Sequence, residues 1–160
     1  MEIGHTLTLL LHLAGLALWL GGIVFFLMVL RPAVNEAEPG IAIRAINRAR
    51  VSFEATSWTG IGLLVATGLA GLFWRQPGSG FYWALLSLKL LLFAAMALHH
   101  CLQVFKYGRR IALLTAQAPL HADDWPEALR MEWEKWFTLL KINAGLGPIV
   151  TLMGLKLMGY

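Results

Sequence analysis

The chain has 160 residues, of which 58% are hydrophobic and 14% are charged, and its mean hydropathy is +0.66. Soluble domains carry about 25% charged residues, so this composition excludes an ordinary soluble protein and predicts an integral membrane protein. The single cysteine, Cys101, excludes an internal disulfide. The net charge of +4 does not indicate nucleic-acid binding, because the basic residues gather beside two connections between apolar segments.

Four apolar segments are each close to the roughly 20 residues that a helix needs to cross a bilayer. They span about residues 7–30, 57–74, 81–105 and 137–158. We therefore expect an all-α membrane protein, a four-transmembrane-helix up-down bundle that forms one domain over residues 1–160. The expected helices cover about residues 5–31, 53–75, 81–107 and 125–158. The amphipathic stretch 127–136 either forms a short interfacial helix before the last span or continues directly into it.

The basic residues predict the orientation of the bundle. Most of the arginines and lysines lie on or beside two connections, residues 33–56 and 106–136. Under the positive-inside rule, these connections are cytoplasmic and both termini lie outside an inner (plasma) membrane. The arginines of residues 44–50 predict a membrane-surface anchor on anionic lipid, with a binding role as the alternative.

The first apolar segment contains one ionisable residue, His12. An ionisable side chain inside a membrane span is a functional-site hypothesis, so His12 is the first candidate. His5, His12 and Trp19 recur at seven-residue spacing and lie near one helix face. Pro32 disfavours helical geometry at the preceding residue and predicts the end of this helix.

Later segments add further candidates. Lys89 lies inside the third segment, and Met96, His100 and Gln103 share its helix face, whereas His99 points about 80° away. His100 is therefore the better candidate for an inward-facing group. In the last segment, Asn143 shares a face with small residues. Further towards the N-terminus, Asp124 and Glu127 have the spacing of a capping box.

Depth divides these candidates into two layers. His12 and Lys89 both lie early in parallel helices, and His5 is near them. His99 and His100 lie more than ten residues deeper, roughly 15–20 Å towards the cytoplasm, in a layer with Asn143. His12 and His100 therefore cannot share one ion. The sequence allows three roles for His12: a metal or haem ligand, a group in a helix–helix hydrogen bond, or part of a proton relay. It allows two roles for Lys89: a site residue, or a side chain that snorkels to the interface.

The chain resembles the copper-resistance D (CopD-like) family of four-helix membrane proteins. Three segments carry the resemblance: residues 11–22 leading to Arg31-Pro32, residues 66–69 after an arginine-rich lead-in, and residues 141–147. The resemblance implies copper import or tolerance, with a metal-delivering periplasmic protein as a partner. The chain lacks the clustered methionines that favour copper(I) transport.

The chain is also similar to the HemJ-type haem-binding protoporphyrinogen oxidases. Those proteins pair a histidine of the first helix with a lysine of the third, which map to His12 and Lys89. Their tyrosine–histidine pair after the first helix is absent, because this sequence has Leu30-Arg31-Pro32 there.

Three functions follow as hypotheses. The leading one is a non-enzymatic membrane protein that handles copper or another transition metal, with His12, His5, His99 and His100 as candidate ligands. The alternative is a haem-dependent membrane oxidoreductase that binds haem b near His12, Lys89, His100 and Asn143. The third is a cofactor-free accessory subunit. The expected partners are the lipid bilayer and, for an oligomer, further copies of the chain.

Overall fold

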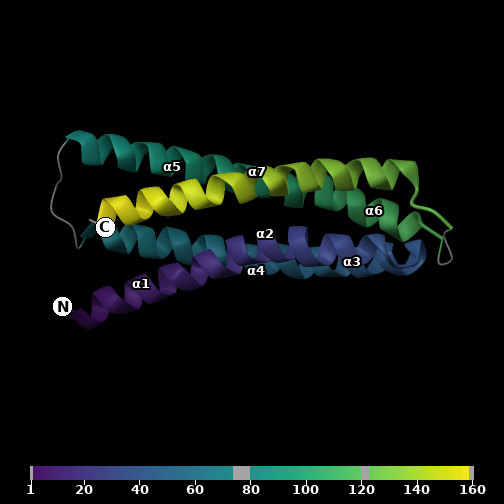
Figure 1. Ribbon diagram of the computed structural model, residues 1–160, viewed down its shortest axis with the longest axis horizontal. Coiled ribbons are helices and arrows are strands. Elements are labelled where there is room, and N and C mark those ends of the chain that lie inside the picture. The colour runs from purple at the N-terminus through teal and green to yellow at the C-terminus, as the bar shows by residue number, and fades with distance from the viewer. Residues whose placement is uncertain (1, 74–79, 120–122, 159–160) are drawn as a thin grey trace.

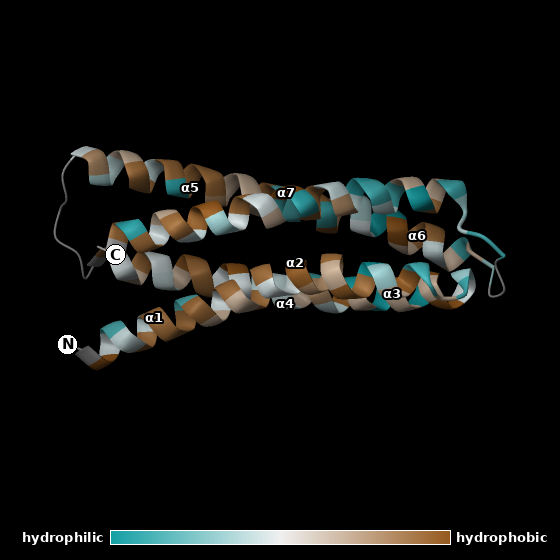
Figure 2. Ribbon diagram, in the orientation of Figure 1, coloured by the Kyte–Doolittle hydropathy of each residue, from teal (hydrophilic) through white to brown (hydrophobic). Residues whose placement is uncertain are grey.

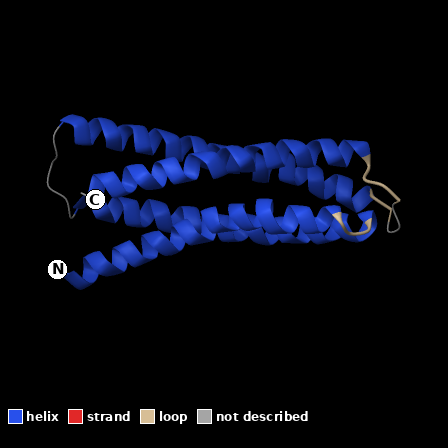
Figure 3. Ribbon diagram, viewed as in Figure 1, coloured by secondary structure: helices blue, strands red, loops and turns tan. Residues whose placement is uncertain are grey.

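The computed structural model describes residues 2–73, 80–119 and 123–158, and every regular element in them is a helix (Figure 3). The helices form long rods that run up and down the bundle (Figure 1). The first rod comprises α1 (Glu2–Leu16), η1 (Ala17–Gly21), α2 (Gly22–Phe25), η2 (Phe26–Leu30) and α3 (Arg31–Asn35). The others are α4 (Pro39–Phe73), then α5 (Gly80–Cys101), η3 (Leu102–Gly108) and α6 (Arg109–Gln117), and finally α7 (Glu127–Met158). The predicted all-α four-helix bundle is confirmed.

Four helical stretches of the described residues are long and apolar enough to cross a membrane. They are Ile3–Asn35, Pro39–Leu72, Gly80–Gln117 and Glu127–Leu157. The chain is an integral membrane protein whose apolar side chains face outward as well as inward, as lipid contact requires.

Each rod is longer than a bilayer is thick. The stretches have 31 to 38 residues, which at about 1.5 Å per residue is roughly 46–57 Å, against about 30 Å of hydrocarbon. The hydrophilic residues gather at the end away from both termini (Figure 2). We call this the charged end, made of α3, residues 39–50 of α4, α6 and residues 127–135 of α7.

The first rod does not end at Pro32, as expected, but continues to Asn35. Proline normally clashes with the carbonyl four residues earlier and lacks the N–H that would bond to it. Here the π-helical turn η2 directly precedes α3, and its wider turn makes room for the ring at the start of a new α-helical segment. Only a short turn before Pro39 then separates the first rod from α4, which begins at Pro39 instead of the expected residue 53 and so includes the basic run.

The third rod is also longer than expected, because η3 carries the helix past residue 107 into α6. Its Ile111 is fully buried against the rest of the charged end, and this burial stabilises a segment that we expected to be a connection.

The expected capping box is wrong. The Trp125 N–H donates to Asp124 Oδ1 (2.7 Å), and α7 begins only at Glu127. The amphipathic stretch then continues directly into the last span. Residues 74–79, between α4 and α5, lie outside the described residues.

Close helix packing depends on glycine at one crossing. A Cβ placed on Gly60 of α4 would lie 2.8 Å from the Gly15 carbonyl oxygen, and a Cβ on Gly15 would lie 2.9 Å from that of Gly60. Small residues at such contacts let backbones approach closely in membranes. Aromatic rings fill the next layer, where Phe26 lies 5.0 Å from Phe53 and 5.2 Å from Trp136 between ring centroids. This packing fixes how α1 and α4 present their polar residues.

Candidate functional site

One polar layer, which we call the His12 layer, receives a residue from each rod. His12 comes from α1, Thr67 from α4, Lys89 from α5 and Gly154 from α7. His12 Nδ1 lies 2.7 Å from Thr67 Oγ1, and Lys89 Nζ lies 3.1 Å from where a Cβ on Gly154 would stand. The positive charge of Lys89 acts electrostatically on the His12 ring. The layer lies in the half of the bundle that carries both termini (Figure 1).

The Thr67 hydroxyl determines the tautomer of His12. Its single hydrogen is directed at the Leu63 carbonyl one helical turn earlier, at an oxygen–oxygen distance of 2.5 Å. Without that hydrogen between them, two oxygens this close would repel each other. We assign the hydroxyl hydrogen to the Leu63 carbonyl, so that Thr67 Oγ1 accepts from His12 Nδ1 and the lone pair of His12 lies on Nε2. An acceptor that binds the N–H of one ring nitrogen orients the other ring nitrogen of a metal-ligating histidine.

His5 is exposed on α1, two helical turns from His12. Among the described residues, no three histidine, cysteine, aspartate or glutamate side chains come together as a group able to hold a metal ion. The His12 layer therefore offers a single imidazole donor beside a cation.

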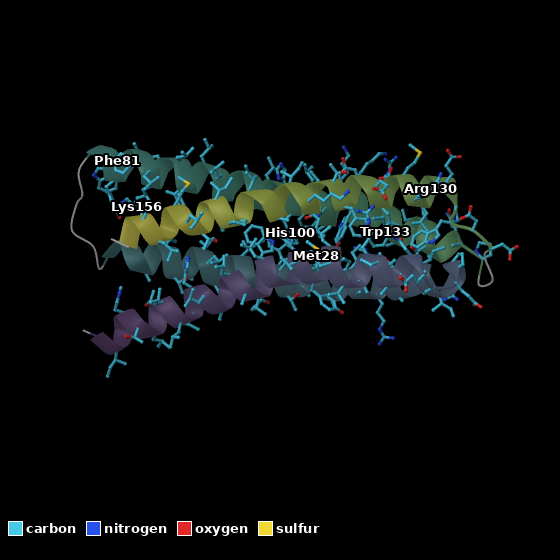
Figure 4. The ribbon with its side chains drawn as sticks, viewed as in Figure 1. Met28, Phe81, His100, Arg130, Trp133 and Lys156 are labelled. Carbon is cyan, nitrogen blue, oxygen red and sulfur yellow. The ribbon has the colours of Figure 1, made fainter. Side chains whose placement is uncertain are left out.

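The second polar layer, the His100 layer, lies in the middle of the bundle (Figure 4). The His100 side chain is fully buried, and its ring packs edge-on against Trp19, Phe53 and Trp58, with ring centroids 6.3, 6.1 and 5.1 Å away. The Gln103 side chain and the Glu54 backbone face the ring, but neither ring nitrogen has a hydrogen-bond partner of good geometry. Such a group is rare in a protein interior.

Other buried polar atoms around His100 are also without a protein partner. They are Trp19 Nε1 and Gln103 Oε1, for which the described residues supply no hydrogen bond of good geometry. Trp19 belongs to the π-helical turn η1 and Gln103 to η3, and π turns occur often at functional sites. The His100 layer thus combines unsatisfied polar atoms with local departures from α-helical geometry.

His99 faces a different partner from His100. Its Nδ1 lies 3.0 Å from Asn143 Oδ1, and the Asn143 amide donates to the Met96 carbonyl at 3.2 Å. Asn143 is fully buried, so this chain of hydrogen bonds ties α5 to α7. The helical spacing that placed Met96, His100 and Gln103 inward agrees with their burial. It did not indicate that His99 also reaches α7.

The two layers are well separated. His12 contacts Thr67 and His100 contacts Trp58, and these two partners are nine residues apart on α4, about 14 Å along the helix. The expectation that His12 and His100 do not share one ion agrees with this spacing.

Arg50 and Glu54 form a buried pair that the sequence did not single out. Their side chains are 5% and 12% exposed and pair at 2.6 Å, and two guanidinium nitrogens of Arg50 donate to Asn47 Oδ1 at 3.0 and 3.1 Å. A Cβ on Gly108 would lie 2.7 Å from Arg50 Nη1, so the glycine makes room for the pair. The i, i+4 spacing was the available signal, but the basic run around Arg50 was interpreted as a surface anchor.

No family model matches this chain, and neither does any curated protein or solved structure. The resemblance to the copper-resistance D and HemJ-type families therefore stays a prediction.

Proposed function

We propose that this chain is a membrane protein that binds one haem b through His12 and carries out redox chemistry with it. The observation that carries the proposal is the hydrogen bond between His12 and Thr67, because it leaves the Nε2 lone pair as the available donor. Cofactor sites in helix bundles are built from inward side chains of facing helices, as in the His12 layer.

The donor set favours haem over a bare copper ion. A porphyrin supplies its own ring nitrogens to the iron, so the protein needs to contribute only one imidazole. A copper ion needs several protein ligands, and the described residues bring no group of three histidine, cysteine, aspartate or glutamate side chains together. Lys89 adds a charge argument, because a cation disfavours a bare metal ion nearby and favours the propionate carboxylates of haem.

The roles of the residues follow from these contacts. His12 supplies the ligating nitrogen, Thr67 holds the ring and its tautomer, and Lys89 is placed to neutralise a carboxylate. When bound, a histidine-ligated haem supplies one-electron redox chemistry, and its electronics depend on the groups around the ligand.

The orientation is part of the proposal. The basic residues at the charged end support a cytoplasmic location for that end in the inner membrane, by the positive-inside rule. Both termini and the His12 layer then lie towards the outer side.

The absorption spectrum of the detergent-purified full chain tests the proposal. We expect a Soret band with reducible α and β bands in the wild type, lost in His12→Ala. His5→Ala is the matched control, because His5 is exposed on the same helix, and it should keep the band. Circular dichroism establishes that each variant is folded.

Two outcomes would contradict the proposal. Stoichiometric copper without a Soret band, lost on His12→Ala, would favour the copper hypothesis instead. If the well-folded protein contains neither haem nor metal even after supplementation with haem, the hypothesis of a cofactor-free accessory subunit is favoured instead.

A further inference from the structure

A small cavity lies at the charged end, far from the His12 layer. It has a volume of about 130 Å³ and opens between α3, α4 and the start of α7. Its walls combine two arginines, Arg31 and Arg130, with the aromatic rings of Trp125, Trp133 and Phe137. Figure 4 shows Arg130 and Trp133 on α7 at the end opposite to Phe81 and Lys156.

The charges of this cavity favour an anion. Arg31 pairs with Glu134 at 2.9 Å, and its guanidinium carbon stands 4.7 Å from the centre of the Phe137 ring. Arg130 makes no ion pair within the part of the chain that the structure describes. One carboxylate therefore faces two guanidinium groups, and the cavity carries a net positive charge.

A buried hydrogen-bond donor adds an independent observation. Trp133 is 3% exposed, it lines the cavity, and its indole N–H has no partner among the described residues. A buried donor without an acceptor is destabilising, so an acceptor oxygen on a ligand would remove this penalty. The cavity thus offers two guanidinium groups and a polar N–H within an aromatic wall.

The depth of the cavity points to lipid. Phe137 begins the last apolar segment and Arg31 directly follows the first one, so the cavity lies where hydrocarbon gives way to water. Tryptophans favour this interface, and basic pockets between membrane helices bind anionic headgroups. A volume of about 130 Å³ accommodates a phosphate headgroup, with the acyl chains outside along the bundle.

We infer that this cavity is a binding site for the phosphate headgroup of an anionic phospholipid. Arg31 and Arg130 bind the phosphate oxygens, the Trp133 N–H donates to one of the oxygens, and Trp125 and Phe137 cover the start of the acyl chains. The inference is independent of haem binding, because no residue of the cavity belongs to the His12 layer.

Native mass spectrometry of the detergent-purified full chain tests it, with phosphatidylglycerol as the probe and phosphatidylcholine as the zwitterionic control. We expect the wild type to retain phosphatidylglycerol in preference. Arg130→Gln should weaken that binding about five- to tenfold, the effect of one interfacial charge. Arg48→Gln is the matched control, because it removes an exposed arginine at the same end outside the cavity and should leave the affinity unchanged.

Trp133→Phe provides a second variant that keeps the ring and removes only the N–H. It should weaken phosphatidylglycerol binding while leaving the lipid-free protein at least as resistant to unfolding as the wild type. Equal losses in Arg130→Gln and Arg48→Gln, or no loss in either, would overturn the inference in favour of diffuse surface attraction or no site. Displacement of the lipid by inorganic phosphate would overturn it in favour of a soluble phosphate ligand.

Discussion

At the scale of single residues, the polar groups inside this bundle differ in how well they are satisfied. His12 has a short hydrogen bond to Thr67, and His99 has one to Asn143, so each ring is held in a defined orientation. Within the described residues, neither ring nitrogen of His100 has a hydrogen bond of good geometry, although His100 is the most deeply buried of the three. Since a satisfied ring nitrogen orients the other one towards a ligand, His12 is the better-prepared donor.

Thr67→Val tests this orientation directly. Valine keeps the shape of threonine but cannot accept the Nδ1 proton, so the ligating tautomer of His12 loses its support. We expect the affinity for haem to fall about 10- to 100-fold, as when other hydrogen-bond partners of a ligating histidine are removed. Haem titration of the apo-protein measures this change.

Thr59→Val is the control for this prediction. Its hydroxyl also donates one turn back along α4, to the Ala55 carbonyl, and it has no hydrogen bond to a histidine among the described residues. If Thr67→Val binds haem as tightly as Thr59→Val does, Thr67 does not orient the ligand.

At the scale of helices, the contact between α1 and α4 depends on two glycines that face each other. Gly15 and Gly60 bring the backbones so close that a methyl group on either would meet a carbonyl oxygen within 3 Å. This contact sets the height of Trp19, and thus of the His100 layer, on α4. Gly62 lies two residues further on, about 200° around the helix from Gly60, and has open space around it.

Gly60→Ala should therefore destabilise the bundle by about 1–3 kcal/mol, because the helices must move apart to admit the methyl group. Gly62→Ala should be neutral or slightly stabilising, since alanine favours the helix and meets no neighbour. Reversible unfolding in mixed micelles measures both variants. Equal effects would show that the close crossing does not contribute to stability.

At the scale of the whole molecule, the rods exceed the bilayer by roughly 15–25 Å, and the excess carries the charges. The charged end is therefore a helical extension into water, held together by ion pairs such as Arg110–Glu132 and Lys135–Glu132. Glu132 is buried, but its two cationic partners are exposed to solvent, which screens both pairs and makes their contribution modest. Packing of Ile111, Leu129 and Trp133 is the larger contribution.

The orientation of this extension is open to direct test. In a Cys101→Ser background, a membrane-impermeant maleimide should label Ile3→Cys in intact cells. Glu36→Cys should be labelled only after permeabilisation, because positive residues keep that end cytoplasmic. Both positions are exposed. The opposite labelling pattern would reverse the proposed orientation.

Hydropathy and helical spacing predicted the class of the protein, the approximate spans and the inward face with Met96, His100 and Gln103. These properties follow from local composition and periodicity, which a single chain displays without its partners. The helix boundaries at Asn35 and Gln117 were missed, because π-helical turns and the burial of Ile111 depend on neighbouring helices.

The partners of the polar residues were decided only by the tertiary structure. His12 bonds to a threonine 55 residues away, and His99 to an asparagine 44 residues away. Arg50 is buried because Gly108, on another rod, leaves room for it. The sequence by itself determined that His12 is an ionisable group inside a membrane span. Which of its nitrogens is available depends on the height at which α4 crosses α1, and that height is set by packing between helices.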